Sequence, residues 1–377
     1  MPAVLHSGSR RRKVKIAYVK TLRLTVDPSR LDTEEARQVI GRAAEILRSG
    51  GLVALPTETV YGLGANALDR DAVAAIFAAK QRPSWDPVIV HVAGPVSDNP
   101  MVAALVTEIP VPAQRLMERF WPGPLTLLLP RSSAVPDSVT AGRPLVGIRM
   151  PAHPVAFELI ARAGIPVAAP SANVFGHISP TTAKHVLDDL DGRIDAIVDA
   201  GPTRHGVEST VLDPREDPPV IYRPGAITAE QIQQAIGPVT FFSGSGAEDA
   251  AAKSFPSPGV SQRHYAPRAR LILIDGPFED LPARLREASK PFEKDRLGIM
   301  LPRELANTEL GAPARAAVEF PWGAWGSPEE LASNLYAGLR ALDAQGCTVI
   351  LCPLPPPTGL GVAVRDRLRK AAFPTGK

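Results

Sequence analysis

Apolar residues recur along the chain at two spacings, one typical of helices and one typical of strands. Residues 33–49 carry apolar side chains three and four positions apart, which predicts an amphipathic helix that Gly50 and Gly51 end. Residues 52–56 are mostly apolar, as in a buried strand, and run into a polar turn at residues 57–59. The same reasoning predicts helices at residues 71–80, 112–120, 154–163 and 228–236, and strands at residues 88–92, 125–129, 146–150, 166–169, 196–199, 209–212 and 220–222.

Two folding units follow from this pattern. Strands and helices alternate over residues 31–240, which predicts an α/β domain whose sheet is not purely parallel. Ser179 and Pro180 predict one more helix start there, because serine is a favourable N-cap and proline fits the first helical position. Residues 241–268 form a predicted linker, since their first part is rich in Gly, Ser and Pro. Residues 269–377 predict a small parallel α/β domain with strands at 271–274, 297–301, 316–320 and 348–352, and helices at 281–288, 328–344 and 361–372.

Composition narrows the class of protein. The 377 residues, 45% hydrophobic and 21% charged, are ordinary for a soluble globular protein of two domains. No run reaches the roughly 18 apolar residues of a membrane span, and the N-terminus does not resemble a secretory signal, so we expect no membrane partner. The two cysteines, Cys347 and Cys352, exclude a disulfide framework and favour a reducing, cytoplasmic location.

The charge is unevenly distributed, although the net charge of +3 does not by itself indicate nucleic-acid binding. Residues 1–30 are predicted to be a basic N-terminal extension. Its basic cluster is typical of a solvated tail, and it also suits an arm that contacts RNA or a partner weakly, so both interpretations stay open. The cluster consists of Arg10, Arg11, Arg12, Lys13 and Lys15.

Three common nucleotide or hydrolase motifs are weak or missing. Residues 62–67, GLGANA, imitate a dinucleotide-binding fingerprint, but the preceding turn is long and polar and no acidic residue stands where the ribose contact belongs. A GxxxxGK[ST] phosphate loop is absent, and so is an intact G-x-S-x-G motif. These observations disfavour an NAD-binding fold, a P-loop ATP site and a serine hydrolase.

Polar residues at element ends are the better candidates. Lys80 and Arg82 follow a predicted helix and combine a point charge with a planar fork, which suits a polyphosphate; a solvated helix end is the alternative. Ser171 and Asn173 leave a strand end on one side, where they cap a turn or bind a ligand.

Two arginines and a histidine also end predicted strands. Arg149 and Arg223 each stand just before a proline, a placement that fits a carboxylate or phosphate site. His91 ends the strand at residues 88–92, where a satisfied core histidine is the plain alternative. The histidines lack metal-ligand spacing, so we expect no protein-bound metal, and any Mg²⁺ to be carried by nucleotide phosphates.

Seven segments together resemble the YrdC/Sua5 family in order and spacing, and the linker exit SPGVSQRHYAP with the second domain resembles the longer Sua5 form. The resemblance covers residues 31–236 and, with the second domain, nearly the whole chain. It implies a twisted, mixed YrdC-like sheet domain followed by a smaller Rossmann-like domain. The segments are GGLVALPTETVYGLGANA, AAKQRPSWDPVIVHV, WPGPLTLLL, VGIRMP, PVAAPSANVFGHISPTTA, HGVESTVLD and YRPGAIT.

The resemblance implies an L-threonylcarbamoyladenylate synthase, a nucleotidyltransferase. Such enzymes join L-threonine, bicarbonate and ATP into threonylcarbamoyl-AMP and release pyrophosphate. A downstream threonylcarbamoyl transferase then modifies adenosine 37 of tRNAs that read ANN codons. The chemistry brings a carbamate anion to the α-phosphorus of ATP, so it needs fixed positive charge and tight positioning.

The resemblance also carries over individual roles. Lys80 and Arg82 match the family's K-x-R, with catalytic roles on the phosphates and the carbamate, and Ser171 and Asn173 match its S-x-N, at the nucleotide. Threonine is implied to lie against Thr57, His91, Arg149 and Ser209, and ATP also against Ser179, Arg223, His264 and Tyr265, of which His264 or Tyr265 closes over the site. The chain departs from the family's sequence pattern at two segments, DPV at residues 86–88 and VSQ at residues 260–262.

Two other functions remain as hypotheses at this point. An RNA-binding module without catalysis would use a basic concave face and the arginine-rich arm, and its binding would be sensitive to salt. Carbamoyl transfer to another acceptor would share the pocket, although the chain shows no zinc motif or carbamoyl-phosphate-using domain. The second domain carries no motif that assigns a role, so a lid, a docking part and an oligomerising part all stay open as hypotheses for it.

Overall fold

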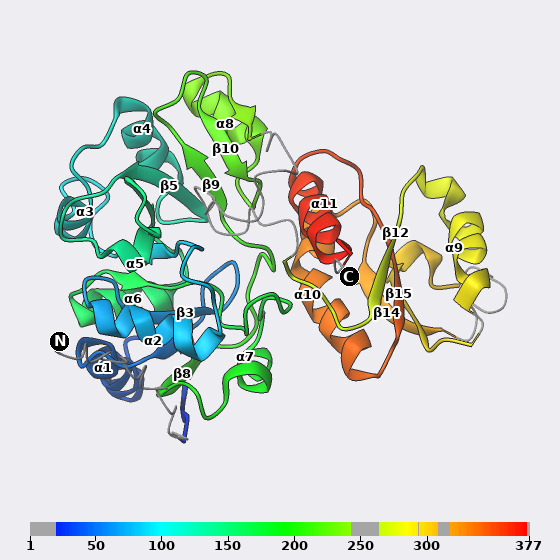
Figure 1. Cartoon of the computed structure of the whole chain (residues 1–377), viewed down its shortest axis with the longest axis horizontal. Helices are drawn as coiled ribbons and strands as arrows, with labels where there is room; N and C mark the ends of the chain where they lie inside the picture. The colour runs from blue at the N-terminus through cyan, green and yellow to red at the C-terminus, as the bar shows by residue number, and fades with distance from the viewer. Residues whose placement is uncertain (1–19, 243–263, 293, 308–316, 375–377) are drawn as a thin grey trace, which may run out of the picture.

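A computed structural model of the chain describes residues 20–242, 264–292, 294–307 and 317–374. These residues form two α/β domains that lie side by side, the larger in blue to green and the smaller in yellow to red (Figure 1). The basic cluster at residues 10–15 and most of the predicted linker lie outside the described residues. Within the described residues, no helix combines the length and the apolar character that a bilayer crossing requires.

The larger domain is built on an eleven-stranded mixed sheet, ordered β1-β8-β2-β3-β7-β4-β6-β5-β9-β10-β11. The sheet contains parallel pairs such as β4 with β6 and antiparallel pairs such as β2 with β3, which confirms the predicted mixed sheet. The strands are β1 (Leu22–Thr25), β2 (Val53–Leu55), β3 (Gly62–Asn66), β4 (Ile89–His91), β5 (Leu125–Pro130), β6 (Leu145–Arg149), β7 (Val167–Ala168), β8 (Ala196–Asp199), β9 (Thr210–Asp213), β10 (Val220–Arg223) and β11 (Thr240–Phe241).

Helices cover both faces of this sheet. Strand β2 shows the division, because Val53 and Leu55 belong to one apolar core and Ala54 to the other, as the two-residue period of a strand requires. Helices α1 and α6 pack together over the first core, and α2, α4, α7 and α8 contribute to the second. The helices are α1 (Glu34–Arg48), α2 (Arg70–Lys80), α3 (Pro100–Leu105), α4 (Val111–Phe120), α5 (Asp137–Thr140), α6 (Pro154–Ala163), α7 (Ala183–Leu190) and α8 (Ala229–Ile236).

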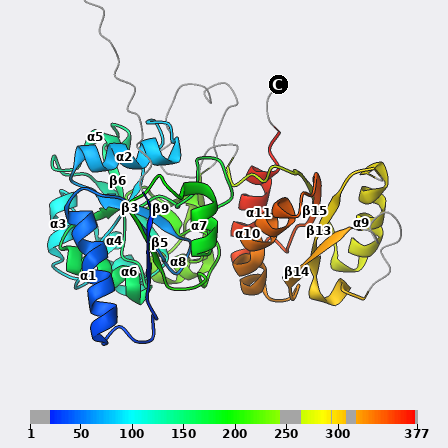
Figure 2. The same cartoon turned by 90° about the horizontal axis from the view of Figure 1, so that it is seen from below.

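The smaller domain has a four-stranded parallel sheet, ordered β12-β15-β13-β14, which confirms the predicted fold class. Helix α9 packs on one face, and α10 and α11 pack on the other, between the small sheet and the larger domain (Figure 2). Its elements are β12 (Arg270–Ile274), η1 (Phe278–Asp280), α9 (Leu281–Ser289), η2 (Lys290–Phe292), β13 (Leu297–Pro302), η3 (Arg303–Leu305), β14 (Val318–Gly323), α10 (Pro328–Ala344), β15 (Val349–Pro353) and α11 (Leu360–Ala371).

The two domains share an apolar core. Val60, Ile178 and Val207 of the larger domain are buried in the same cluster as Leu331 and Leu335 of α10. A close backbone approach accompanies this packing at Gly206, whose φ is +69° and whose absent Cβ would stand 2.5 Å from the carbonyl oxygen of Ala332. The domains are therefore joined by dense packing as well as by the linker.

One predicted helix start is wrong. Ser179 and Pro180 precede an extended segment, and α7 begins at Ala183 with Thr182 as its N-cap, accepting from the amide of His185. The Ser179 hydroxyl instead donates to Glu208, a tertiary contact that a local capping rule cannot anticipate. Three strands were also not predicted. They are β1, which lies within the predicted extension and pairs with β8, β3, which occupies the glycine-rich fingerprint-like segment, and β11, which pairs with β10 where the predicted linker begins.

Candidate active site

A cavity opens in the larger domain where the carboxyl-terminal ends of several strands meet the linker exit. Its walls come from the turn after β2, the chain after α2, β4, β6, the segment after β7, and β9 and β10. Nine of the twelve predicted site residues line it, and the other three, Lys80, Asn173 and Ser179, lie behind the wall. The lining residues are Thr57, Thr59, Val60, Gly62, Arg82, Ile89, His91, Arg149, Ala169, Pro170, Ser171, Glu208, Ser209, Arg223, His264 and Tyr265.

Lys80 connects the K-x-R and S-x-N segments. It is the last residue of α2 and is only 1% exposed. Its Nζ donates to the carbonyl oxygens of Ser171 and Asn173, the latter at 2.6 Å. Burial, with a further contribution from Arg82, lowers the pKa of Lys80 well below its ordinary value. Through its two hydrogen bonds to carbonyl oxygens, Lys80 fixes the backbone of the S-x-N segment.

Arg82 follows a sharp turn, because Gln81 ends α2 in the left-handed region with φ of 53°. Its guanidinium pairs with Asp86 at 2.9 Å and donates to the carbonyl of Pro87 at 2.7 Å, and it lies 5.8 Å from the ring centre of Phe175. Burial lowers the pKa of Arg82 and raises that of Asp86, while each charge stabilises the other. Arg82 is thus a preformed positive group whose counter-ion, Asp86, is part of the chain.

Arg149, at the end of β6, is held by three partners. It pairs with Glu58 at 2.7 Å and donates to Thr59 Oγ1 at 2.9 Å and to the carbonyl of Gly123 at 3.2 Å. Burial by itself would raise the pKa of Glu58, but Arg149 holds it below the usual value. The Thr57 hydroxyl shares a hydrogen bond of 2.8 Å with Thr59.

His91 lies beside this pair and is 3% exposed. Burial, reinforced by the positive charge of Arg149, lowers its pKa to about 3, so the imidazole is neutral near pH 7. Its Nδ1 is buried without a hydrogen-bond partner in the described residues. A buried ring nitrogen of this kind is suited to a ligand that supplies the missing partner.

Ser209 and Arg223 form another part of the cavity wall. Arg223 donates to the carbonyl and to the hydroxyl of Ser209, both at 3.1 Å, and Ser209 Oγ lies 2.8 Å from Thr126 Oγ1. The chain after Arg223 can approach β9 closely because Gly225 has no side chain. A Cβ at this position would stand 2.3 Å from the amide nitrogen of Thr210. Burial lowers the pKa of Arg223.

Glu208 is a wall residue that sequence reasoning missed. Its Oε1 accepts from Ser179 Oγ at 2.6 Å, and its side chain also contacts the smaller domain. Burial would raise the pKa of Glu208, but Arg367 and Arg223 lower it to about 2. Glu58, Thr59 and Glu208 all lie inside the quoted TET and VEST motifs, so the signal was present in the motif even though no role was assigned.

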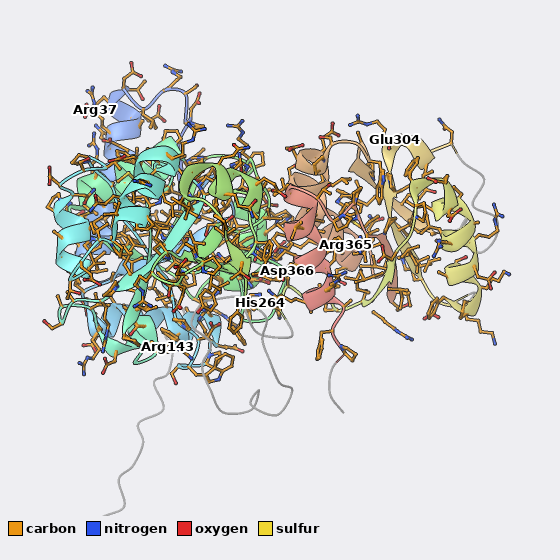
Figure 3. The ribbon with its side chains drawn as sticks, turned by 90° about the horizontal axis from the view of Figure 1, so that it is seen from above. Arg37, Arg143, His264, Glu304, Arg365 and Asp366 are labelled. Carbon is orange, nitrogen blue, oxygen red and sulfur yellow. The ribbon has the colours of Figure 1, made fainter. Side chains whose placement is uncertain are left out.

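The linker exit reaches into the cavity. His264 is 5% exposed and Tyr265 is 1% exposed, and His264 packs edge-on against Phe175 with ring centres 5.6 Å apart. In Figure 3, His264 lies between the two domains near Asp366 of α11. Burial, with the charges of Arg82 and Lys80, lowers the pKa of His264 to about 3. Sequence reasoning placed these two residues at the site, and both line it.

The charged groups around the cavity suit anionic ligands. Arg82, Arg149 and Arg223 line it, with Lys80 directly behind, and each carboxylate near them is already paired with an arginine. Among the described residues, no three His, Cys, Asp or Glu side chains gather in a way that would hold a metal ion. The pocket thus offers fixed positive charge, hydroxyls and backbone groups.

Comparison with known proteins assigns the chain to a family. Residues 45–225 match the Sua5, YciO and YrdC family model described as telomere recombination, and residues 227–373 match the model of the threonylcarbamoyl-AMP synthase C-terminal domain. A threonylcarbamoyl-AMP synthase of Pyrococcus abyssi is 44% identical over 336 residues, which cover 88% of this chain and 93% of that protein. The Bacillus subtilis enzyme of that name is 44% identical over 358 residues, covering 94% and 98%.

A solved structure supports the same assignment. Pyrococcus abyssi Sua5 in complex with L-threonine has a TM-score of 0.81 and 40% sequence identity, and the match covers 94% of this chain and 97% of that one. The chain therefore belongs to the Sua5/YrdC family of threonylcarbamoyl-AMP synthases, in the long Sua5 form, and is an enzyme of the nucleotidyltransferase kind.

Proposed function

We propose that the chain makes threonylcarbamoyl-AMP and pyrophosphate from L-threonine, bicarbonate and ATP. The observation that carries the proposal is the cavity itself, where Arg82, Arg149 and Arg223 converge from three separate motifs. Both anions of the reaction, the carbamate and the triphosphate, require fixed positive charge. The threonine bound to Pyrococcus abyssi Sua5 supports an amino-acid substrate for this chain too.

The reaction has two bond-forming steps. The amine of threonine combines with bicarbonate to give a carbamate and water, and a carbamate oxygen then attacks the α-phosphorus of ATP as the bond to pyrophosphate breaks. Enzymes catalyse such attack at phosphorus mainly by positioning the reactants and by stabilising the negative charge of the transition state. We assign these tasks to Lys80 and Arg82, whose K-x-R segment lies next to the S-x-N turn.

Threonine is assigned to the side of the cavity formed by Thr57, His91, Arg149 and Ser209. The buried His91 Nδ1 has no partner in the described residues and is neutral near pH 7, so it suits a hydrogen bond from a donor on the amino acid. Arg149 supplies a positive charge close by, in the fork geometry that suits a carboxylate.

ATP is assigned to the side formed by Ser171, Asn173, Ser179 and Arg223, together with His264 and Tyr265, which we propose close over the nucleotide. Asn173 donates to the carbonyls of Val174 and His177, which shapes the turn, while its buried Oδ1 has no partner in the described residues. Mg²⁺ is proposed to arrive on the ATP phosphates as part of the substrate.

The product is proposed to serve the modification of adenosine 37 in tRNAs that read ANN codons. A threonylcarbamoyl transferase would take the product and act on the tRNA, in the cytoplasm. Weak RNA contact through the basic N-terminal cluster is part of the same proposal, and it rests on the sequence alone because residues 10–15 are not described.

Pyrophosphate release from ATP tests the function directly. Threonine and bicarbonate are each left out in turn, and the adenylate is identified by mass spectrometry. We expect release only when both are present. Release with neither would identify an ATPase or a different acceptor, and no release in any mixture would contradict the synthase and favour a binding protein.

A further inference from the structure

The smaller domain reaches the cavity wall through one buried carboxylate. Glu208 Oε2 accepts from Arg367 Nε of α11 at 2.8 Å and from the Tyr336 hydroxyl of α10 at 2.9 Å. Its other oxygen accepts from Ser179. Glu208 is 6% exposed, and the other three side chains are fully buried. A single carboxylate thus joins a predicted ATP contact to both inner helices of the smaller domain.

The same two residues of the smaller domain also hold the linker exit. The rings of Tyr265 and Tyr336 are stacked with centres 5.6 Å apart, and the guanidinium carbon of Arg367 lies 5.5 Å from the centre of the Tyr265 ring. Tyr265 has φ of 62°, a backbone conformation that is unfavourable for a bulky side chain unless packing maintains it. Arg367 and Tyr336 therefore fix two parts of the cavity at once.

The charges explain why this contact matters for the cavity. Arg367 and Arg223 are the arginines that stabilise the negative charge of Glu208. A buried carboxylate without its partner is strongly unfavourable, so loss of Arg367 would draw Arg223 toward Glu208 and away from Ser209. Arg223 and Ser179 both belong to the proposed nucleotide side.

We propose that Arg367 and Tyr336 are positioning residues for ATP. They act through Glu208 and Tyr265, and they give the smaller domain a role in nucleotide binding. Neither residue lines the cavity, so neither is a catalytic residue. The inference rests on the proposed function in one respect, that the side of the cavity near Ser179 and Arg223 receives ATP.

The chain offers a matched control for this role. Arg340 of α10 also crosses between the domains, pairing with Asp189 at 2.9 Å and donating to the carbonyl of Ile178. It has no contact with Glu208 or Tyr265 among the described residues. Arg340→Met therefore weakens the docking of the domains and leaves the positioning contacts in place, whereas Arg367→Met removes a positioning contact.

The test uses the full chain with Arg367→Met, Arg367→Lys, Tyr336→Phe and Arg340→Met. ATP affinity is measured by calorimetry, KM for ATP and for threonine by pyrophosphate release, and stability by thermal unfolding. We expect Arg367→Met to weaken ATP binding about tenfold and raise the KM for ATP similarly. The KM for threonine should rise less, because Ser209 loses Arg223 but keeps its hydrogen bond to Thr126. Arg367→Lys should recover part of the affinity, and Arg340→Met should leave both KM values within about twofold.

Equal kinetic changes in Arg367→Met and Arg340→Met would show that the smaller domain only docks, and would overturn the inference. If Arg367→Met does not fold, Tyr336→Phe decides, because it removes one hydrogen bond to Glu208 and keeps the ring against Tyr265. An unchanged ATP affinity in Tyr336→Phe would then overturn it. A wild-type chain that binds ATP and releases no pyrophosphate would contradict the proposed function. The positioning role would then be tested by the ATP affinities of the variants, measured by calorimetry.

Discussion

The two sides of the cavity are built on different principles. On the proposed threonine side, Arg149 is paired with Glu58 at 2.7 Å, and both belong to the larger domain. On the proposed nucleotide side, Glu208 of the larger domain is paired with Arg367 of the smaller one at 2.8 Å. Both ion pairs are buried, but only the second depends on how the domains are docked. One proposed substrate site is therefore local to the larger domain, and the other is shared between the two domains.

Arg82 should give the largest effect, since we assign it to both the carbamate and the phosphates. Arg82→Ala removes a preformed positive group and leaves Asp86 buried without its partner. We expect kcat/KM to fall by about 10²–10³, which corresponds to about 3–4 kcal/mol of transition-state stabilisation. Initial rates of pyrophosphate release measure it.

The control for Arg82 is Arg42→Ala, which removes an exposed ion pair with Glu45 on α1 and should leave the rate unchanged. An Arg82→Ala variant as active as Arg42→Ala would show that the K-x-R motif has no part in the chemistry.

Glu58→Gln should separate the two sides. It leaves Arg149 without its counter-charge, so we expect the KM for threonine to rise about tenfold and the free energy of unfolding to fall by about 3 kcal/mol. ATP affinity should stay within about twofold of wild type, because among the described residues the side-chain partners of Arg149 are Glu58, Thr59 and Gly123, all outside the proposed nucleotide side. Calorimetry with each substrate compares the two; an equal loss for ATP would show that the sides are not separate.

Tyr265→Ala should weaken the nucleotide side more mildly. The substitution removes a ring that stacks on Tyr336 and lines the cavity, so we expect the KM for ATP to rise about fivefold. Tyr265→Phe keeps the ring and is the matched control. If threonine binding suffered as much as ATP binding, the tyrosine would serve the whole cavity.

The smallest effect concerns pH. The pKa of His264 is about 3 in the folded chain, below its ordinary value of 6.5, so the folded state resists protonation. Its contribution to stability is complete above pH 6.5 and decreases as the pH falls from 6.5 toward 3. Between pH 7.0 and 5.5 this costs about 1 kcal/mol, which His264→Phe should abolish. Denaturant unfolding at both pH values measures it; equal losses in both proteins would contradict the burial of a neutral His264.

Local patterns predicted the regular elements well because their signals are local. Residues 154–163 form α6 as predicted, with Pro154 at its start and Gly164 in the left-handed conformation at its end. Strand β3 was not predicted, because Gly62 and Gly64 interrupt the apolar pattern. A Cβ at Gly64 would stand 2.7 Å from the side chain of Leu55, so the close packing here requires glycine. The same glycine weakens the apolar pattern by which a strand is predicted.

The site residues also differ in whether a local sequence pattern could predict them. The family motifs brought nine predicted residues to the cavity, since each motif is a short contiguous segment. Glu208 and Arg367 are 159 positions apart, and neither segment indicates the other. Ser179 illustrates the same limit, because its hydroxyl bonds to Glu208 across 29 positions and so does not cap a helix. Contacts between domains have no local signature.

The shared apolar core has a consequence for the cooperativity of unfolding. Val60, Ile178 and Val207 are buried with residues of α10, so separating the domains would expose apolar surface on both. Two domains connected only by a linker would melt independently. Here the melting of either domain removes part of the other's interior, and a calorimetric scan of the intact chain is expected to show a single transition.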